Sequence, residues 1–110
     1  MRAVEVPCVL NIAAVKLKAK EYDEAIYECN KILEMEEEFD YAPDWVTKAR
    51  YRRGQAHAGK QNFDLALSDL LRVQKLQPND QAVKKEIITL KKTQQIHKEK
   101  EKKMYGKMFG

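Results

Sequence analysis

The stretch Lys48-Ala-Arg-Tyr-Arg-Arg-Gly54, followed by Ala66, Leu70 and Pro78, decides the fold of this 110-residue chain. An upstream copy of the same pattern is present, because residues 11–14 align with residues 52–55, Ala25 with Ala66, Cys29 with Leu70 and Ile32 with Val73. The two alanines lie 41 residues apart. The chain therefore contains two versions of one structural unit, and each unit has a small residue where two helices must pack closely.

The offsets of Gly54, Ala66, Leu70 and Pro78 are similar to those of the 34-residue tetratricopeptide (TPR) repeat, a helix–turn–helix that stacks into a superhelix with a peptide-binding groove. A spacing of 41 residues then means one repeat plus a seven-residue insertion. We predict an all-α, single-domain TPR superhelix of two repeats with a long C-terminal capping helix. The expected boundaries are 6–39 and 47–79 for the repeats, 40–46 for the acidic insertion and 80–108 for the capping helix.

Apolar periodicity predicts helices over 7–18, 23–36, Trp45 to about His57, 63–76, and from Asp80 onward. Pro43 is expected to end the preceding structure, with Asp44 as the N-cap of the next helix. We expect the last helix to fray near Gly106. The side chains expected inside include Ala25, Ile26, Cys29, Ile32, Leu33, Leu65, Ala66, Leu70, Val73, Leu76, Ala82, Val83, Ile87, Leu90 and Ile96.

The composition suits a soluble, mostly helical protein: 44% of residues are hydrophobic and 35% charged, with 4 glycines and 3 prolines. We expect a cytoplasmic location. No apolar run is long enough for a membrane span, and the N-terminus does not resemble a signal peptide. Cys8 and Cys29 are expected to be free, buried thiols in a reducing compartment, the alternative being a disulfide or redox switch. No spacing of residues suggests a metal, a cofactor or catalysis, and His57 is expected to pack within its repeat.

Charge is unevenly distributed along the chain. Residues 34–44 contain six acids and no base, whereas residues 84–107 contain nine lysines and three glutamates. The acidic stretch is interpreted as a solvated loop or as a screen against wrong acidic partners. The basic stretch is interpreted as a projecting solvated helix, and its alternating glutamates argue against nucleic-acid binding.

Lys48 and Arg52 are the strongest candidates for ligand binding. They lie four residues apart, so both side chains leave the same face of one helix. A lysine point charge and an arginine fork suit a pair of carboxylates. A solvated basic face is the alternative interpretation. Arg53 points about 100° away from Arg52 and is expected to lie outside such a site.

Four blocks of the chain resemble the C-terminal TPR module of the large immunophilin co-chaperones of the cyclophilin and FKBP types. They are Cys8-Val-Leu-Asn-Ile-Ala-Ala14, Lys48-Ala-Arg-Tyr-Arg-Arg-Gly54, Phe63-Asp-Leu-Ala-Leu-Ser-Asp69 and Lys98-Glu-Lys-Glu-Lys-Lys-Met-Tyr-Gly-Lys-Met-Phe109. The resemblance covers nearly the whole chain. The last block is a separate match, because it lies outside the repeats.

This resemblance implies binding to the C-terminal Met-Glu-Glu-Val-Asp tail of the ninety-kilodalton heat-shock chaperone, or to that of the seventy-kilodalton one. In the family, five residues form a carboxylate clamp on the terminal Asp. Asn11, Lys48 and Arg52 match three of them, and Ala14 and Lys18 are placed along the groove. An asparagine that only bridges backbones is the alternative for Asn11. The resemblance also implies calmodulin binding at the C-terminal helix, around Met104, Tyr105, Met108 and Phe109.

The chain departs from the family pattern in one respect: the first repeat and the isomerase domain are absent. We therefore expect a fragment of a longer protein or an internal start site, with no enzymatic activity of its own. Loss of the two clamp residues of the first repeat should weaken peptide binding by roughly a hundredfold or more. The alternative function is a scaffold that braces a neighbouring domain or self-associates, by dimerisation or helix swapping, through its apolar first helix. Trp45 is expected in the core, or else against the ligand.

Overall fold

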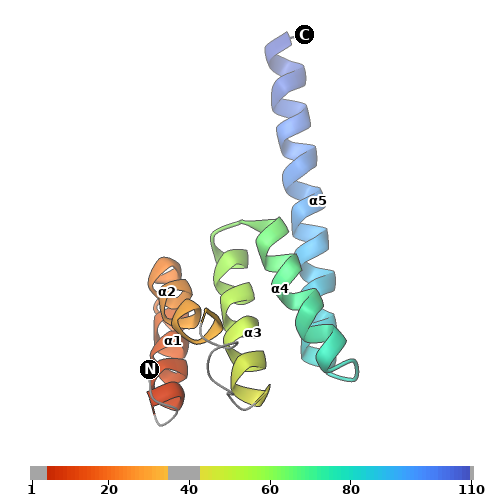
Figure 1. Ribbon diagram of the computed structural model, residues 1–110. Coiled ribbons are helices and arrows are strands. Elements are labelled where there is room, and N and C mark those ends of the chain that lie inside the picture. The colour runs from red at the N-terminus through yellow and green to blue at the C-terminus, as the bar shows by residue number, and fades with distance from the viewer. Residues whose placement is uncertain (1–4, 35–42, 110) are drawn as a thin grey trace.

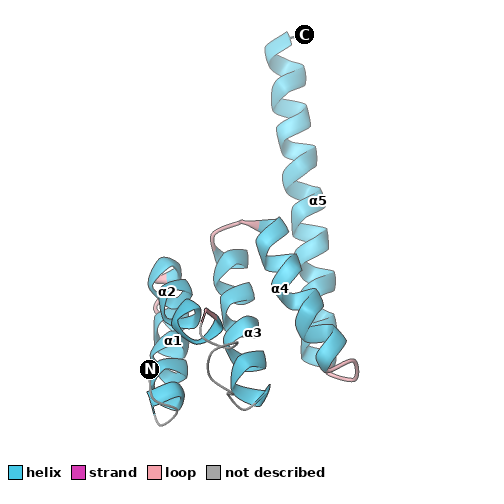
Figure 2. Ribbon diagram, in the orientation of Figure 1, coloured by secondary structure: helices cyan, strands magenta, loops and turns pink. Residues whose placement is uncertain are grey.

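The computed structural model describes residues 5–34 and 43–109, with side chains described to residue 102. This part of the chain forms five helices joined by short loops (Figure 1, Figure 2). Their bounds are α1 Val6–Lys18, α2 Tyr22–Leu33, α3 Pro43–Gly59, α4 Phe63–Leu76 and α5 Gln81–Phe109. The all-α prediction is confirmed. Residues 40–42 of the predicted insertion lie outside the described residues, and residues 43–46 belong to α3.

The helices form a row in which α3 contacts α1, α2 and α4, and α4 contacts α5. In Figure 1, α1 and α2 lie on one side of α3, and α4 and α5 lie on the other. The far half of α5 extends beyond the other helices, which gives the molecule dimensions of 59 × 29 × 24 Å. α3 is therefore the central helix.

The turns of the two hairpins have the same geometry at a spacing of 41 residues. Lys20 has a φ of 60° and Gln61 a φ of 63°, both in the left-handed region. The amide of each donates to the carbonyl three residues earlier, and the amide of each following residue, Glu21 or Asn62, donates to the carbonyl five residues earlier. These bonds satisfy the last carbonyls of the first helix of each hairpin. The sequence periodicity of 41 residues is thus also a periodicity of the backbone.

Two apolar clusters hold the row together. The first contains the buried residues Val6, Val9, Leu10, Ile32, Leu33 and Ala49, with Trp45 and Val46 packed against it. This contact supports the interpretation of Trp45 as a core residue. The second cluster joins α4 to α5 through Ala66, Leu70, Val73, Val83, Ile87 and Leu90. Because these residues recur at helical spacing, each helix turns one stripe toward its neighbour.

The N-termini of α3 and α5 differ in the position of their aspartate relative to the helix cap. α3 begins at Pro43, so the expectation that Pro43 precedes the helix was wrong: proline suits the first helical turn, where its missing N–H costs nothing. Asp44 lies in that turn and not at the cap. At α5, Asp80 does act as a cap, because its Oδ1 accepts hydrogen bonds from the amides of Ala82 (3.0 Å) and Val83 (3.3 Å).

Several side chains that were predicted inside are exposed. Leu65, Leu76 and Ile96 retain 54%, 59% and 54% of their accessible surface. Each lies on the side of its helix that no described neighbour covers, and Ala82 is exposed as well. The expected fraying at Gly106 was also wrong, because α5 continues as a helix to Phe109.

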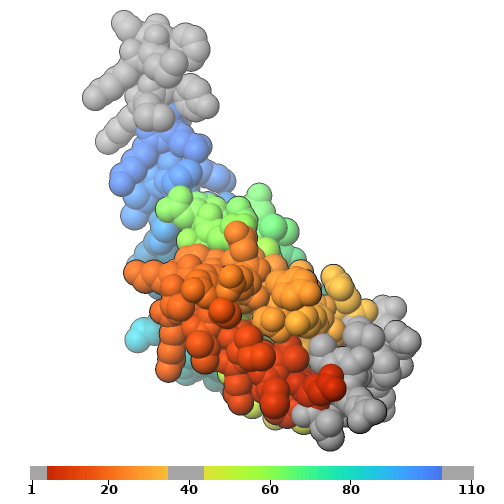
Figure 3. All heavy atoms as spheres, turned by 90° about the vertical axis from the view of Figure 1, so that its left-hand side faces the viewer, coloured from red at the N-terminus to blue at the C-terminus, as the bar shows by residue number. Residues whose placement is uncertain are grey.

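α1 has a bare outward face (Figure 3), with no other described helix in front of it. Ile12 and Val15 retain 43% and 63% of their accessible surface, and Cys8 is exposed too. The expectation that Cys8 is buried was therefore wrong. The positions 41 residues later are Ala49, Arg53 and Ala56, and both alanines are completely buried. The same helix face that is covered in α3 is thus open in α1.

Candidate functional site

A cavity of about 420 Å³ contains the predicted cations Lys48 and Arg52, and we call it the basic cavity. Both residues lie on α3, one turn apart, so the helix presents them to the same space. Asp44 and Asp80 are also in its wall, but Asp80 already caps α5. The full lining is Asp44, Thr47, Lys48, Tyr51, Arg52, Gln55, Val73, Gln77, Asp80 and Val83.

Arg52 links the basic cavity to α1. Its Nη1 donates a 2.6 Å hydrogen bond to the main-chain oxygen of Leu10. A charged donor on a carbonyl is stronger than a neutral pair, so this contact holds the guanidinium at the α1–α3 junction. Asn11 is the next residue of α1, and its side chain is exposed. Arg52 thus lies next to the main chain of the third predicted clamp residue.

The other two predicted site residues are farther from this arrangement. Ala14 is half-buried and Lys18 is exposed near the end of α1. Neither Ala14, Lys18 nor Asn11 is among the residues that line the basic cavity. The structure therefore brings Lys48 and Arg52 together, and all five roles in peptide binding stay predictions.

A second cavity, of about 560 Å³, adjoins the first and is more apolar; we call it the apolar cavity. Gln55 is in the wall of both. Glu86 of α5 is half-buried there, and its Oε1 accepts hydrogen bonds from Tyr51 Oη at 2.8 Å and Gln55 Nε2 at 2.9 Å. The lining is Gln55, Ala58, Phe63, Leu70, Ala82, Lys85, Glu86, Thr89, Leu90 and Thr93.

The phenol of Tyr51 has a raised pKa in this environment. Its burial raises the pKa, and the hydrogen bond to Glu86 raises the pKa further. Tyr51 therefore remains a neutral hydrogen-bond donor at physiological pH. α3 and α5 are thereby connected across the two cavities by hydrogen bonds to one carboxylate.

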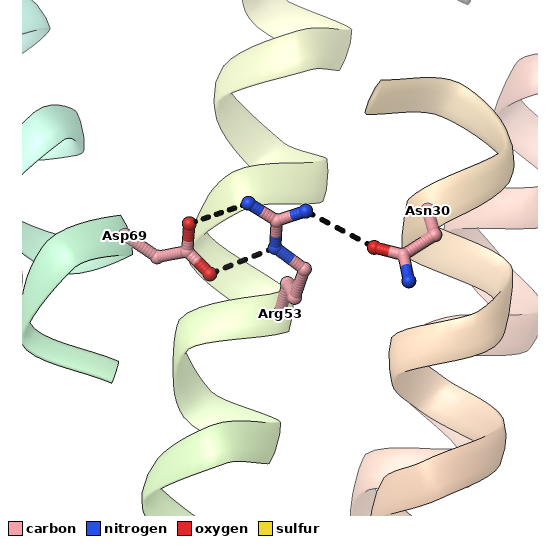
Figure 4. Close-up of polar contacts among 3 residues, drawn as sticks. All are labelled: Asn30, Arg53 and Asp69. Atoms are coloured by element: carbon pink, nitrogen blue, oxygen red, sulfur yellow. Dashed lines mark hydrogen bonds and ion pairs between the residues drawn. The ribbon is translucent and has the colours of Figure 1, made fainter. Parts of the chain in front are cut away.

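Arg53 makes a three-residue network that the sequence did not predict (Figure 4). Its Nε and Nη2 donate to the two carboxylate oxygens of Asp69 at 2.8 and 2.7 Å, and its Nη1 donates to Asn30 Oδ1 at 3.0 Å. The Asp69 side chain is only 7% exposed. The network joins α2, α3 and α4 and explains why Arg53 is directed away from Arg52. The available signal was an aspartate among the buried positions Ala66, Leu70 and Val73.

The two cysteines differ in environment, and both are free thiols. Cys29 is completely buried, and burial raises its pKa to about 12. A thiol with so high a pKa is a poor nucleophile at neutral pH, which agrees with a packing role.

His57 is half-buried, and its Nδ1 is a buried atom without a hydrogen-bond partner. Burial lowers its pKa, with smaller contributions from neighbouring Arg53 and Lys60 that partly oppose Asp69. The neutral imidazole is therefore the favoured form in the folded chain. This agrees with the expectation that His57 packs within its hairpin.

The basic part of α5 is exposed over residues 98–102. Lys98, Lys100 and Lys102 are exposed. Met104, Tyr105, Met108 and Phe109, the residues proposed for calmodulin, lie beyond the described side chains. Within residues 5–34 and 43–102, no cluster of three potential metal ligands occurs. Among the described helices, none combines the length and apolar character needed to span a bilayer.

No protein-family model matches this chain. Curated relatives do match over nearly all of it. The chain is 40% identical to the peptidyl-prolyl cis-trans isomerase FKBP42 of Arabidopsis thaliana over 97% of its length. It is 34% identical to FKBP4 of Bos taurus over 98% of its length, and 32% identical to the FK506-binding protein 59 of Drosophila melanogaster over 99%.

The chain is homologous to the C-terminal part of FKBP-type immunophilins, and this part is helical here. The predicted immunophilin resemblance is confirmed, and the relatives are of the FKBP type. The chain spans 22–27% of the length of these relatives. The isomerase activity in their names is a property of those whole proteins.

Proposed function

We propose that this chain is a TPR-type protein-interaction module of an FKBP immunophilin co-chaperone, and that it binds the acidic C-terminal peptide of the ninety-kilodalton heat-shock chaperone. The observation that carries the proposal is the basic cavity, which combines Lys48 and Arg52 and is joined through Arg52 to the α1 backbone beside Asn11. Cytoplasmic location and the boundaries 6–39, 40–46, 47–79 and 80–108 belong to the same proposal.

The repeat arrangement is supported by the two hairpin turns, which have equivalent hydrogen bonds 41 residues apart. Homology to FKBP-type immunophilins supports the co-chaperone class. A TPR stack lines its groove with the first helix of each hairpin. In this chain those helices are α1 and α3, which carry all five proposed binding residues: Asn11, Ala14, Lys18, Lys48 and Arg52.

The chemistry of the ligand follows from the cavity. A C-terminal aspartate offers two carboxylates, one on the main chain and one on the side chain. Arg52 can exchange its contact with the Leu10 carbonyl for a charged acceptor, and Lys48 adds a second, exposed cation. Each charge-assisted hydrogen bond contributes about 1.5–3 kcal/mol. Asn11 can donate its amide without adding charge.

Calorimetric titration with Met-Glu-Glu-Val-Asp tests the proposal, beside the same peptide amidated at its C-terminus. We expect binding that weakens with salt and is lost on amidation. Lys48→Ala and Arg52→Ala should each weaken binding by about tenfold or more. Lys91→Ala, which removes an exposed lysine of α5 that does not line the cavity, serves as the matched control. Equal binding of the free and amidated peptides would contradict the clamp.

Self-association is a second candidate function, favoured by the bare α1 face with Cys8, Ile12 and Val15. A helix surface of this kind is typical of a position where another helix packs. The mass in solution distinguishes the two cases, because a monomer has a mass of 12.8 kDa. If self-association occurs through this face, Val15→Lys should restore the monomer at high concentration. A monomeric wild type would exclude this candidate.

A further inference from the structure

Glu86 is an acidic residue held in place beside a basic site. Its Oε1 receives two hydrogen bonds, from Tyr51 Oη and Gln55 Nε2. These donors lie one turn apart on α3, so they fix the carboxylate from the opposite side of the groove between α3 and α5. The carboxylate therefore has a defined position, unlike that of a freely rotating surface glutamate.

The surroundings of Glu86 make its charge effective. It is half-buried in the wall of the apolar cavity, together with Phe63, Leu70 and Leu90. Lys85 is also in that wall, but its side chain is exposed, so solvent screens it more strongly. A second carboxylate placed in this cavity would lose water and meet a like charge.

The basic and apolar cavities form one path along α3. Tyr51 is in the wall of the basic cavity and donates to Glu86 in the apolar one, and Gln55 is in the wall of both. From Lys48 to Ala58 the α3 axis rises about 15 Å. An extended peptide covers about 13 Å over four residues. A peptide whose last residue binds at Lys48 and Arg52 thus brings the residue four positions earlier to the apolar cavity.

We propose that Glu86 is a specificity-determining residue, which excludes an acidic side chain from the apolar cavity and admits an uncharged one four positions before the C-terminal aspartate. This inference rests on the proposed function, because it concerns the same peptide. Glu86 then fixes the register: a peptide rich in glutamate binds with its acids near Lys48 and Arg52 and its apolar residue beside α5. The occupant is an uncharged side chain such as methionine.

The test compares Met-Glu-Glu-Val-Asp with Glu-Glu-Glu-Val-Asp by calorimetry at low salt, for the wild type and for Glu86→Gln. The wild type should favour the methionine peptide by about tenfold or more. Glutamine keeps an acceptor for Tyr51 and Gln55 but removes the charge, so the preference should fall several-fold. Glu86→Asp, which keeps the charge, should retain it. Glu99→Gln, which removes an exposed acid of the same helix, is the matched control and should leave the preference unchanged.

A wild-type measurement avoids any dependence on how the variants fold. Gln-Glu-Glu-Val-Asp has a side chain nearly the size of glutamate but no charge, and it should bind several-fold more tightly than Glu-Glu-Glu-Val-Asp. Met-Glu-Glu-Glu-Asp carries the added acid at the valine position instead. Its loss of affinity relative to Met-Glu-Glu-Val-Asp should be the same in the wild type and in Glu86→Gln.

The outcomes separate the two proposals. If the wild type binds Met-Glu-Glu-Val-Asp but Glu86→Gln shows the same preference, the role of Glu86 is overturned and the clamp stands. Equal binding of the glutamine and glutamate peptides would also overturn it. The role of Glu86 would also be overturned if Glu86→Gln reduced the penalty for Met-Glu-Glu-Glu-Asp, because the peptide would then bind in a different register. If the wild type binds none of the peptides, both proposals fail.

Discussion

Arg53 and Asp69 form a doubly hydrogen-bonded ion pair between α3 and α4, with both bonds between 2.7 and 2.8 Å. The aspartate is almost completely buried. The same guanidinium also donates a 3.0 Å hydrogen bond to Oδ1 of Asn30 in α2. One side chain of the central helix thus connects both neighbouring helices. Arg52, the preceding residue of α3, lies in the wall of the basic cavity instead.

Asp69→Asn should destabilise the fold by about 3 kcal/mol, because it leaves a partly buried guanidinium without its counter-charge. Urea denaturation followed by circular dichroism measures the change. Arg53→Lys should cost less, since lysine keeps the charge but not the two-bond geometry. Arg72→Lys, at an exposed position of α4, is the control and should have little effect. An unchanged urea midpoint for Asp69→Asn would contradict the role of the pair.

Gly59→Ala should destabilise the fold more than Gly54→Ala does. A Cβ at Gly59 would lie 2.3 Å from Cζ of the Tyr22 ring, whereas one at Gly54 would lie 3.2 Å from Asp69 and Leu70. Displacing a ring at the start of α2 costs about 1–3 kcal/mol. The thermal midpoints of the two variants test this order. Tyr22→Ala/Gly59→Ala should lose less than the sum of its single variants, and simple additivity would show that the contact does not matter.

Gln61→Gly and Lys20→Gly should each stabilise the chain by up to about 1 kcal/mol. Both residues have a positive φ, which is unfavourable for a side chain and free of strain for glycine. Lys18→Gly, inside the last turn of α1, is the matched control and should destabilise by about the same amount. Guanidinium unfolding gives the three values. A loss of stability at both turn positions would mean that their side chains contribute more than the backbone strain.

The stability of the folded chain should decrease as pH falls from 8 to 5.5, in part because of His57. Its pKa is lowered in the folded state, so the unfolded chain binds the proton more readily. The loss therefore begins near the unfolded value of about 6.5 and is complete below the folded value. His57→Gln should reduce this slope. Equal slopes for the wild type and His57→Gln would contradict the prediction.

Repetition along the chain predicted the hairpins, because helix periodicity and the small residues at Gly54, Ala25 and Ala66 are local signals. The position of Lys48 and Arg52 in one cavity followed from their spacing on one helix. The Arg53–Asp69 pair was missed because it joins residues 16 apart on different helices, where a one-dimensional pattern has no sign of facing partners. The burial of Cys8, Leu65 and Leu76 was overestimated, since periodicity identifies an apolar face but not whether a neighbour covers it.

The open face of α1 and the covered end at α5 make this stack directional. At the α5 end, α4 packs against α5, and the exposed side of α5 carries the lysines Lys91 and Lys92 as well as Ile88 and Ile96. At the α1 end, the exposed face contains Cys8, Ile12 and Val15. The equivalent positions of α3, 41 residues later, are Ala49, Arg53 and Ala56, and this face of α3 packs against α2. A further helix pair packed on the open face of α1 would extend the array away from the basic C-terminal helix, and the basic cavity would remain near α5.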